Sequence, residues 1–222
     1  MRTFLRGLGQ LFITAGLVIL LFTAYELFGT GIATGRAQND LRGDLRHNWA
    51  KDSGGGAGPD AGVREVGNGQ PLAILRIPRF GKGWSPRVVV EGVTAADLRI
   101  GPGHYPKTAL PGQLGNFSVA GHRATHGNGF FKMDQMQGGD AIVVETRLMW
   151  LTYRVTSISR VKPTDVGVIA PVPDHPGMVP TLRMITLTTC DPWYSAAHRL
   201  IVHGVLQSAT PKSAGPPAAL KG

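Results

Sequence analysis

The sequence predicts an all-β domain preceded by a transmembrane helix. Three observations support this prediction: an uncharged apolar run near the N-terminus, several short strand-like segments between residues 71 and 207, and an abundance of turn-forming residues. The chain has 222 residues, of which 42% are hydrophobic, 31 are glycine and 16 are proline. This length accommodates one ordinary domain with attachments.

The apolar run covers residues 7–25, nineteen residues without a charge. A helix of that length spans about 28 Å, close to the ~30 Å thickness of a bilayer's hydrocarbon core. We therefore expect a short cytoplasmic tail over residues 1–6 and a transmembrane signal anchor over residues 7–28. A cleaved signal peptide is the alternative.

The arginines around this segment do not determine its orientation. Arg2 and Arg6 precede it, whereas Arg36, Arg42 and Arg46 follow it closely enough to count in the positive-inside comparison. The very short N-terminal tail is compatible with a chain whose remainder is exported.

Residues 29–70 read as a flexible linker, because residues 53–59 (SGGGAGP) have the composition of a flexible coil. Leu41, Leu45 and Trp49 are four residues apart and allow a fraying helix within this linker. Residues 208–222, which contain three prolines, are predicted to be a disordered tail.

The part between linker and tail, residues 71–207, is rich in strand-like segments. They cover residues 72–77, 87–91, 116–120, 141–145, 151–158, 182–188 and 200–206. In one of them Leu151, Tyr153 and Val155 alternate with polar residues, which is the period of a half-buried strand. Seven or eight strands with few helices predict a closed or nearly closed β-barrel.

Two short helices are expected between the strands. Thr94 and Asp97 have the spacing of a capping box for a helix that runs toward Ile100. Residues 130–136 are compatible with a further helical turn.

The charge and the single cysteine exclude several classes of protein. The net charge is +9 and the pI is about 10.2, but the basic residues are scattered and do not alternate with aromatics as in a nucleic-acid platform. We expect no nucleic-acid partner; anionic lipid head groups or cell-wall polymers fit better. Because Cys190 is the sole cysteine, neither an intramolecular disulfide nor a cysteine-rich zinc site is possible.

Three segments place reactive side chains at the ends of predicted strands. They are residues 120–123 (AGHR), 186–192 (TLTTCDP) and 198–204 (HRLIVHG). Taken singly, Cys190 reads as a small core residue, His122 as a hydrogen-bonded histidine and Arg199 as a solvated arginine. Together they suggest acyl transfer: a thiol nucleophile, an imidazole that exchanges protons near neutral pH, and a guanidinium that stabilises an oxyanion.

These segments resemble the sortases, a family of cysteine transpeptidases. Leu187-Thr188-Thr189-Cys190 fits the family's nucleophile stretch, His122 follows Ala-Gly as the family's histidine does, and Arg199 opens the next strand. The resemblance extends over residues 71–206. It implies an eight-stranded sortase-type β-barrel with short helices, with His122, Cys190 and Arg199 as catalytic residues.

Residues 101–106 (GPGHYP), 111–116 (PGQLGN) and 121–127 (GHRATHG) are similar to the actinobacterial class E sortases. This resemblance implies that Cys190 cleaves the Thr-Gly bond of a C-terminal sorting signal of LAXTG or LPXTG type and forms a thioacyl intermediate. An amine of the lipid-linked peptidoglycan precursor then accepts the secreted protein. The implied location is the cell membrane, with a single span and an extracellular catalytic domain.

Several neighbouring residues have weaker assignments. We expect Tyr105 to line the signal-peptide pocket and Thr189 to contact the substrate, with an ordinary loop tyrosine and a strand threonine as the alternatives. His203 reads as structural. His126 lies four residues after His122, but no glutamate follows His122 as a zincin requires; we expect neither a metal site nor a cofactor.

Two other functions remain as alternatives. An exported L,D-transpeptidase would also use a cysteine, but that family places a His-Gly segment ahead of the cysteine, whereas here His203-Gly204 follows it. A membrane-tethered β-domain could bind peptides without catalysis. Activity of Cys190 on a sorting-signal peptide separates the three functions.

Overall fold

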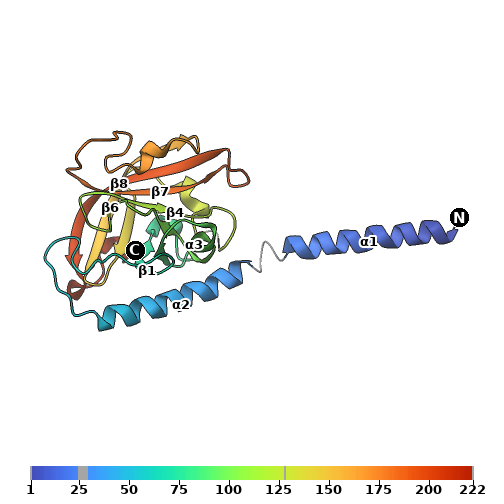
Figure 1. The fold of residues 1–222 in the computed structure, drawn as a ribbon, viewed down its shortest axis with the longest axis horizontal. Coiled ribbons are helices and arrows are strands. Elements are labelled where there is room, and N and C mark those ends of the chain that lie inside the picture. The colour runs from blue at the N-terminus through green and yellow to red at the C-terminus, as the bar shows by residue number, and fades with distance from the viewer. Residues whose placement is uncertain (1, 25–29, 128, 222) are drawn as a thin grey trace.

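The computed structural model describes residues 2–24, 30–127 and 129–221. In the described chain, eight strands form a closed barrel in the order β1-β2-β3-β4-β7-β8-β6-β5 (Figure 1). The strands are β1 (Pro71–Arg76), β2 (Arg87–Glu91), β3 (Gly103–His104), β4 (Gly115–Ala120), β5 (Ala141–Glu145), β6 (Met149–Val161), β7 (Arg183–Asp191) and β8 (His198–Pro211). The prediction of an eight-stranded barrel is therefore confirmed.

The apolar residues that alternate along the strands fill the inside of the barrel. The predicted alternating residues of β6, Leu151, Tyr153 and Val155, all lie in the main hydrophobic core. Ile185 and Leu187 of β7 join the same core. Because successive side chains of a strand point to opposite faces, Thr186, Thr188 and Cys190 face the outside of the barrel.

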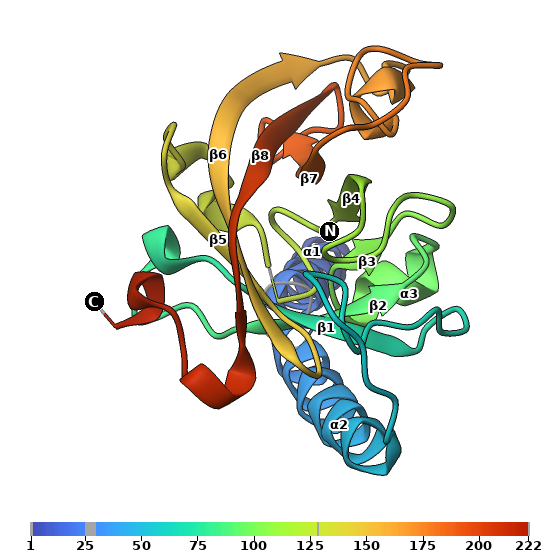
Figure 2. The same ribbon diagram turned by 90° about the vertical axis from the view of Figure 1, so that its left-hand side faces the viewer.

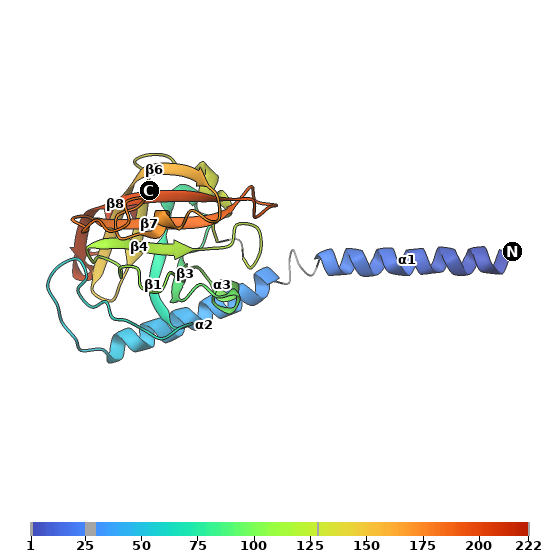
Figure 3. The same cartoon turned by 45° about the horizontal axis from the view of Figure 1, so that its top comes forward.

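The ends of three strands meet on one side of the barrel. β4 runs parallel to β7, with Ala120 level with Thr188, and β7 runs antiparallel to β8, with Cys190 opposite Arg199. Figure 3 shows β4, β7 and β8 side by side. This arrangement brings the C-terminal ends of β4 and β7 to the start of β8.

The two short helices that the sequence predicted are present in the structure. α3 (Ala95–Ile100) begins with the predicted capping box, in which the Thr94 backbone N–H donates to the Asp97 carboxylate at 2.9 Å. η3 (Phe131–Gln135) lies within the predicted helical turn. The remaining 3-10 helices are η2 (Pro78–Phe80), η4 (Val166–Ile169), η5 (Lys212–Ala214) and η6 (Ala218–Leu220).

The N-terminal helix α1 (Arg2–Ala24) extends away from the barrel (Figure 1). Its segment Arg2–Thr23 is long and apolar enough to cross a membrane, and large side chains such as Ile13 and Ile19 are exposed. The helix begins before residue 7, where the anchor was predicted to start. Residues 25–28 of the predicted anchor lie outside the described residues.

The prediction of a flexible linker is wrong for residues 30–51, which form helix α2 (Thr30–Lys51). Leu41 and Leu45 pack against Ile74, Val88 and Val90 on the outer face of β1 and β2. Figure 2 shows α2 running beneath these strands. The spacing of Leu41, Leu45 and Trp49 allowed a fraying helix here, but the partner of these side chains, the outer face of β1 and β2, is defined only by the folded barrel. Residues 52–70 contain turns but no helix or strand.

The prediction of a disordered tail at residues 208–222 is also wrong for the described part. β8 continues to Pro211 because it pairs with β6 as far as Met149. The Lys212 ammonium then forms an ion pair with Glu145 at 2.8 Å and lies 4.6 Å from the centre of the Trp49 ring. These contacts join the end of α2, the C-terminal segment and the barrel.

Candidate functional site

Cys190 and Arg199 are directly opposite each other on neighbouring antiparallel strands, β7 and β8. Directly opposed side chains lie on the same face of a sheet, with their Cβ atoms about 4.5–5.5 Å apart. The free, half-buried thiol of Cys190 and the side chain of Arg199 are therefore neighbours. One guanidinium nitrogen of Arg199 donates to the backbone carbonyls of Ala196 and His198, both at 3.0 Å.

His122 lies just beyond the end of β4. The Gly121 N–H donates to the Thr188 carbonyl at 3.0 Å, so the parallel alignment of β4 and β7 continues to the residue before the histidine. Continuing that alignment by one residue places His122 level with Cys190. A Cβ at position 121 would lie 2.6 Å from the Phe130 ring, which explains the glycine before the histidine.

The environment of His122 favours its neutral form. Burial lowers the pKa of His122 from its ordinary value, and the nearby His126 lowers it further. The two rings stack with their centroids 4.8 Å apart. A neutral imidazole at pH 7 can accept a proton, which a general base for a thiol must do.

Tyr105 lies on the same side as the reactive cysteine. Its hydroxyl is 3.0 Å from the Thr188 hydroxyl, and Thr188 shares the outer face of β7 with Cys190 because the two residues are two positions apart. The half-buried tyrosine thus lies beside the end of β7 that carries Cys190.

Thr189 points the other way and is buried, with 3% of its surface exposed. Its hydroxyl donates to the Gly121 carbonyl at 2.8 Å. The hydroxyl therefore joins the end of β7 to the residue before His122. This geometry favours the alternative, in which Thr189 is a structural strand residue, over the predicted contact of Thr189 with the substrate.

His203 belongs to a buried polar group on the outer face of β4, β7 and β8. The Thr186 hydroxyl is 2.8 Å from the His203 Nδ1 atom and donates to the Asn116 side-chain oxygen at 2.7 Å. The Asn116 amide then donates to the Val168 and Ala170 carbonyls at 3.2 and 3.0 Å. Burial lowers the pKa of His203, against an opposing effect of Asp174. The group fixes the loop before β7 to the barrel.

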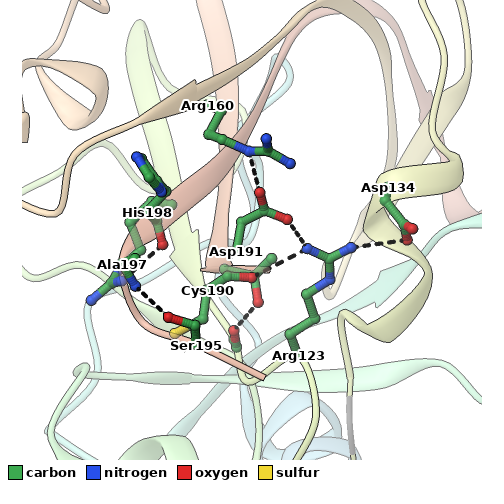
Figure 4. A network of polar contacts seen from close by, with 11 residues as sticks. Arg123, Asp134, Arg160, Cys190, Asp191, Ser195, Ala197 and His198 are labelled. Atoms are coloured by element: carbon green, nitrogen blue, oxygen red, sulfur yellow. Dashed lines mark hydrogen bonds and ion pairs between the residues drawn. The ribbon is translucent and has the colours of Figure 1, made fainter. Parts of the chain in front are cut away.

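The structure also brings together four charged residues that the sequence reasoning missed. Arg123 and Asp191, which directly follow His122 and Cys190, form a buried ion pair, and Arg160 and Asp134 contact this pair from either side (Figure 4). For Arg123 and Asp191 the available signal was their position in two segments already selected for their chemistry, whereas Arg160 and Asp134 lie outside those segments. Among the described residues, no group of three or more His, Cys, Asp or Glu side chains is placed to hold a metal ion.

Comparison with known proteins agrees with this geometry. Residues 75–207 match the sortase domain family. Sortase SrtE1 of Streptomyces coelicolor is 38% identical over 229 residues, a match that covers 97% of this chain and 60% of the relative. The chain thus spans about three fifths of that relative's length.

Two solved structures have the same barrel. Sortase E from Streptomyces avermitilis is 44% identical, with a TM-score of 0.63 and coverage of 70% of this chain and 99% of the other. Sortase E1 from Streptomyces coelicolor, solved with a tripeptide in its active site, is 39% identical, with a TM-score of 0.63 and coverage of 68% and 97%. The strand-end cysteine, the closed barrel and the family match lead to one conclusion: this chain belongs to the sortases, a family of cysteine transpeptidases.

Proposed function

We propose that this protein is a membrane-anchored sortase that cleaves the Thr-Gly bond of a C-terminal sorting signal and transfers the cleaved protein to an amine of the peptidoglycan precursor. The observation that supports this best is the placement of three side chains. Cys190 and Arg199 form a direct cross-strand pair, and the β4 end that leads into His122 runs parallel to β7, with Ala120 level with Thr188, two residues before Cys190.

The proposed reaction has two steps. The Cys190 sulfur attacks the threonine carbonyl while neutral His122 receives the thiol proton, and the guanidinium of Arg199 stabilises the oxyanion. His122 returns the proton to the departing glycine amine, which leaves a thioester on Cys190. The acceptor amine then attacks the thioester, and His122 passes the proton of this amine to the departing sulfur, which restores the Cys190 thiol.

Arg199 must exchange partners in this mechanism. In the structure its guanidinium binds the carbonyls of Ala196, in the loop between β7 and β8, and of His198, the first residue of β8. Those bonds are on an exposed loop, so a substrate carbonyl that becomes an oxyanion competes well for the same donors. The fork geometry of a guanidinium allows it to keep one loop contact while it binds the substrate.

Peptide binding on this face has independent support. The tripeptide in the active site of the Streptomyces coelicolor sortase E1 structure indicates that a similar barrel binds short peptides there. We assign Tyr105 to the wall of the signal pocket because its hydroxyl reaches Thr188, two residues before Cys190. A hydroxyl at this place favours a signal of LAXTG type over LPXTG, because it occupies space that a proline ring would fill.

Helix α1 is the proposed anchor. Its apolar side chains are exposed over a length sufficient for one span. The catalytic barrel then lies on the extracellular side, where the secreted proteins and the lipid-linked precursor are available. The membrane-bound enzyme and its membrane-bound acceptor then meet at the outer surface of the same membrane.

The test uses the full chain in detergent, incubated with LAXTG and LPXTG peptides and analysed by intact-protein mass spectrometry. We expect a thioacyl adduct on the sole thiol, formed faster with LAXTG, and no adduct or cleavage with Cys190→Ala because the nucleophile is absent. A folded Cys190→Ala protein that still cleaves the peptide would refute the proposal. Binding without cleavage by the wild type would favour the non-catalytic alternative.

A further inference from the structure

An ion pair links the two residues that directly follow the proposed nucleophile and base. A guanidinium nitrogen of Arg123 pairs with the Asp191 carboxylate, and the same nitrogen lies 3.4 Å from the Cys190 carbonyl oxygen (Figure 4). Both side chains are buried, with 5% of Arg123 and 3% of Asp191 exposed. The pair therefore lies beneath the reactive residues and not on the open surface.

Charged side chains from two other elements complete the group. Arg160 of β6 pairs with the second oxygen of Asp191, and the other terminal nitrogen of Arg123 is 3.2 Å from the Asp134 carboxylate of η3. A buried carboxylate is costly unless cations surround it. Here two guanidiniums hold the Asp191 carboxylate, which restricts where the end of β7 can lie.

Each reactive residue is thus held on both sides. Before them, the Gly121 N–H bonds the Thr188 carbonyl and the Thr189 hydroxyl bonds the Gly121 carbonyl at 2.8 Å. After them, Arg123 bonds Asp191. Cys190 lies between Thr189 and Asp191, and His122 lies between Gly121 and Arg123.

We propose that the Arg123–Asp191 ion pair is a positioning device that fixes His122 and Cys190 relative to each other for acyl transfer. Proton transfer from the thiol requires the imidazole within hydrogen-bond distance, and a displacement of about 1 Å reduces rates by about 100-fold. Arg123 and Asp191 act through their neighbours and are not catalytic residues. This inference depends on the proposed roles of Cys190 and His122.

The chain offers a matched control at the other end of the barrel. The Glu145 carboxylate is also largely buried and also lies between two cations, Arg76 at 2.7 Å and Lys212 at 2.8 Å. Lys212 follows the end of β8, so this group is roughly 43 Å along that strand from Arg199. Glu145→Gln removes a similar ion pair far from the site.

The experiment compares wild type, Asp191→Asn and Glu145→Gln as full chains in detergent. We measure single-turnover acylation by an LAXTG peptide, its dependence on peptide concentration, and thermal unfolding. Asp191→Asn is expected to lower the maximal acylation rate at least 10-fold with half-saturation changed less than 2-fold. Glu145→Gln is expected to lower the Tm by about as much as Asp191→Asn does, but to keep the acylation rate within 2-fold of the wild-type rate.

A second readout does not depend on the peptide. Because Cys190 is the sole thiol, its alkylation by iodoacetamide at pH 7.5 reports its reactivity directly. We expect alkylation of Asp191→Asn to be at least 3-fold slower than that of wild type. If wild type never acylates but this difference is present, the proposed function fails and the positioning role stands.

Equal acylation and alkylation rates in wild type and folded Asp191→Asn would overturn the inference, as would an equal loss of rate in Glu145→Gln. Should Asp191→Asn not fold, Arg123→Lys and Arg123→Met give the same test. Lysine keeps the charge beside Asp191, so it is expected to recover at least 5-fold more activity than methionine. Equal activity of the two arginine variants would also overturn the positioning role.

Discussion

The chemistry of single residues in this site depends on how much water reaches them. His122 is half-buried, and desolvation of its cationic form is the main reason that its pKa is lowered. Because the folded pKa lies below the unfolded value of about 6.5, the folded state binds fewer protons near pH 6. The contribution of His122 to stability is therefore fully present above the unfolded pKa of about 6.5 and is lost as the pH falls through the lower folded pKa.

Substitution of His126 tests this description at the residue scale. The second cause of the lowered pKa of His122 is repulsion from His126, so His126→Gln is expected to raise the pKa of His122. The pKa should still remain below the ordinary value because burial is unchanged. An NMR titration of the His122 ring measures it, with His47→Gln on α2 as the control. An unchanged or lower pKa in His126→Gln would contradict the stacked geometry.

At the scale of elements, helix α2 supplies hydrogen-bond partners to the part of β2 that the short strand β3 does not reach. β3 has two residues and pairs only with the end of β2 at Val90 and Glu91, so the Val88 backbone has no strand partner on that side. The buried side chain of Gln38 replaces it: its oxygen accepts from the Val88 N–H at 2.7 Å, and its nitrogen donates to the Val88 and Ile100 carbonyls at 3.1 and 2.8 Å. The helix thus caps an exposed strand edge.

Gln38→Met tests this role, because methionine keeps the helix and the volume but makes none of these bonds. We expect it to lower the free energy of unfolding by about 3 kcal/mol, since buried backbone groups lose their partners at about 1–3 kcal/mol each. Chemical denaturation measures the loss. Asn39→Ala, an exposed neighbour on the same helix, should change stability by less than about 0.5 kcal/mol. Equal effects of the two changes would exclude the capping role.

In the whole molecule, α2 contacts the loop that follows His122. A Cβ at Gly127 would lie 3.1 Å from the methyl group of Thr34, which belongs to α2. α2 therefore packs against the loop that follows His122. The predicted boundary at residue 71 is where β1 begins, and we infer that α2, which packs on β1 and β2, belongs to the same folded unit.

Two truncations test this boundary. Residues 30–222 should remain soluble without detergent, because the exposed apolar helix α1 is removed, and should retain the Tm and the acylation rate of the full chain. Residues 71–207 should lose both, because they lack α2 and Lys212. Differential scanning calorimetry and the mass-spectrometric acylation assay measure the two properties. Full stability and activity of residues 71–207 would show that α2 is dispensable.

How much of this protein could be predicted depended on the range of the interactions involved. The barrel strands and the capping box of α3 were predictable because alternation and capping are local patterns. The two-residue strand β3 was not, because only its pairing with Val90 and Ala120 defines it. The same holds for α2, whose apolar residues gain meaning only against β1 and β2.

By itself the sequence determined the fold class, the apolar N-terminal helix and the three segments that carry His122, Cys190 and Arg199. Only the tertiary structure decided which side chains face one another: the cross-strand pairing of Cys190 with Arg199, the inward turn of Thr189, and the Arg123–Asp191 pair. The reason is physical. Strand period and composition act between neighbours in the chain, whereas register and buried charge pairing depend on segments that are distant in sequence and meet only when the barrel closes.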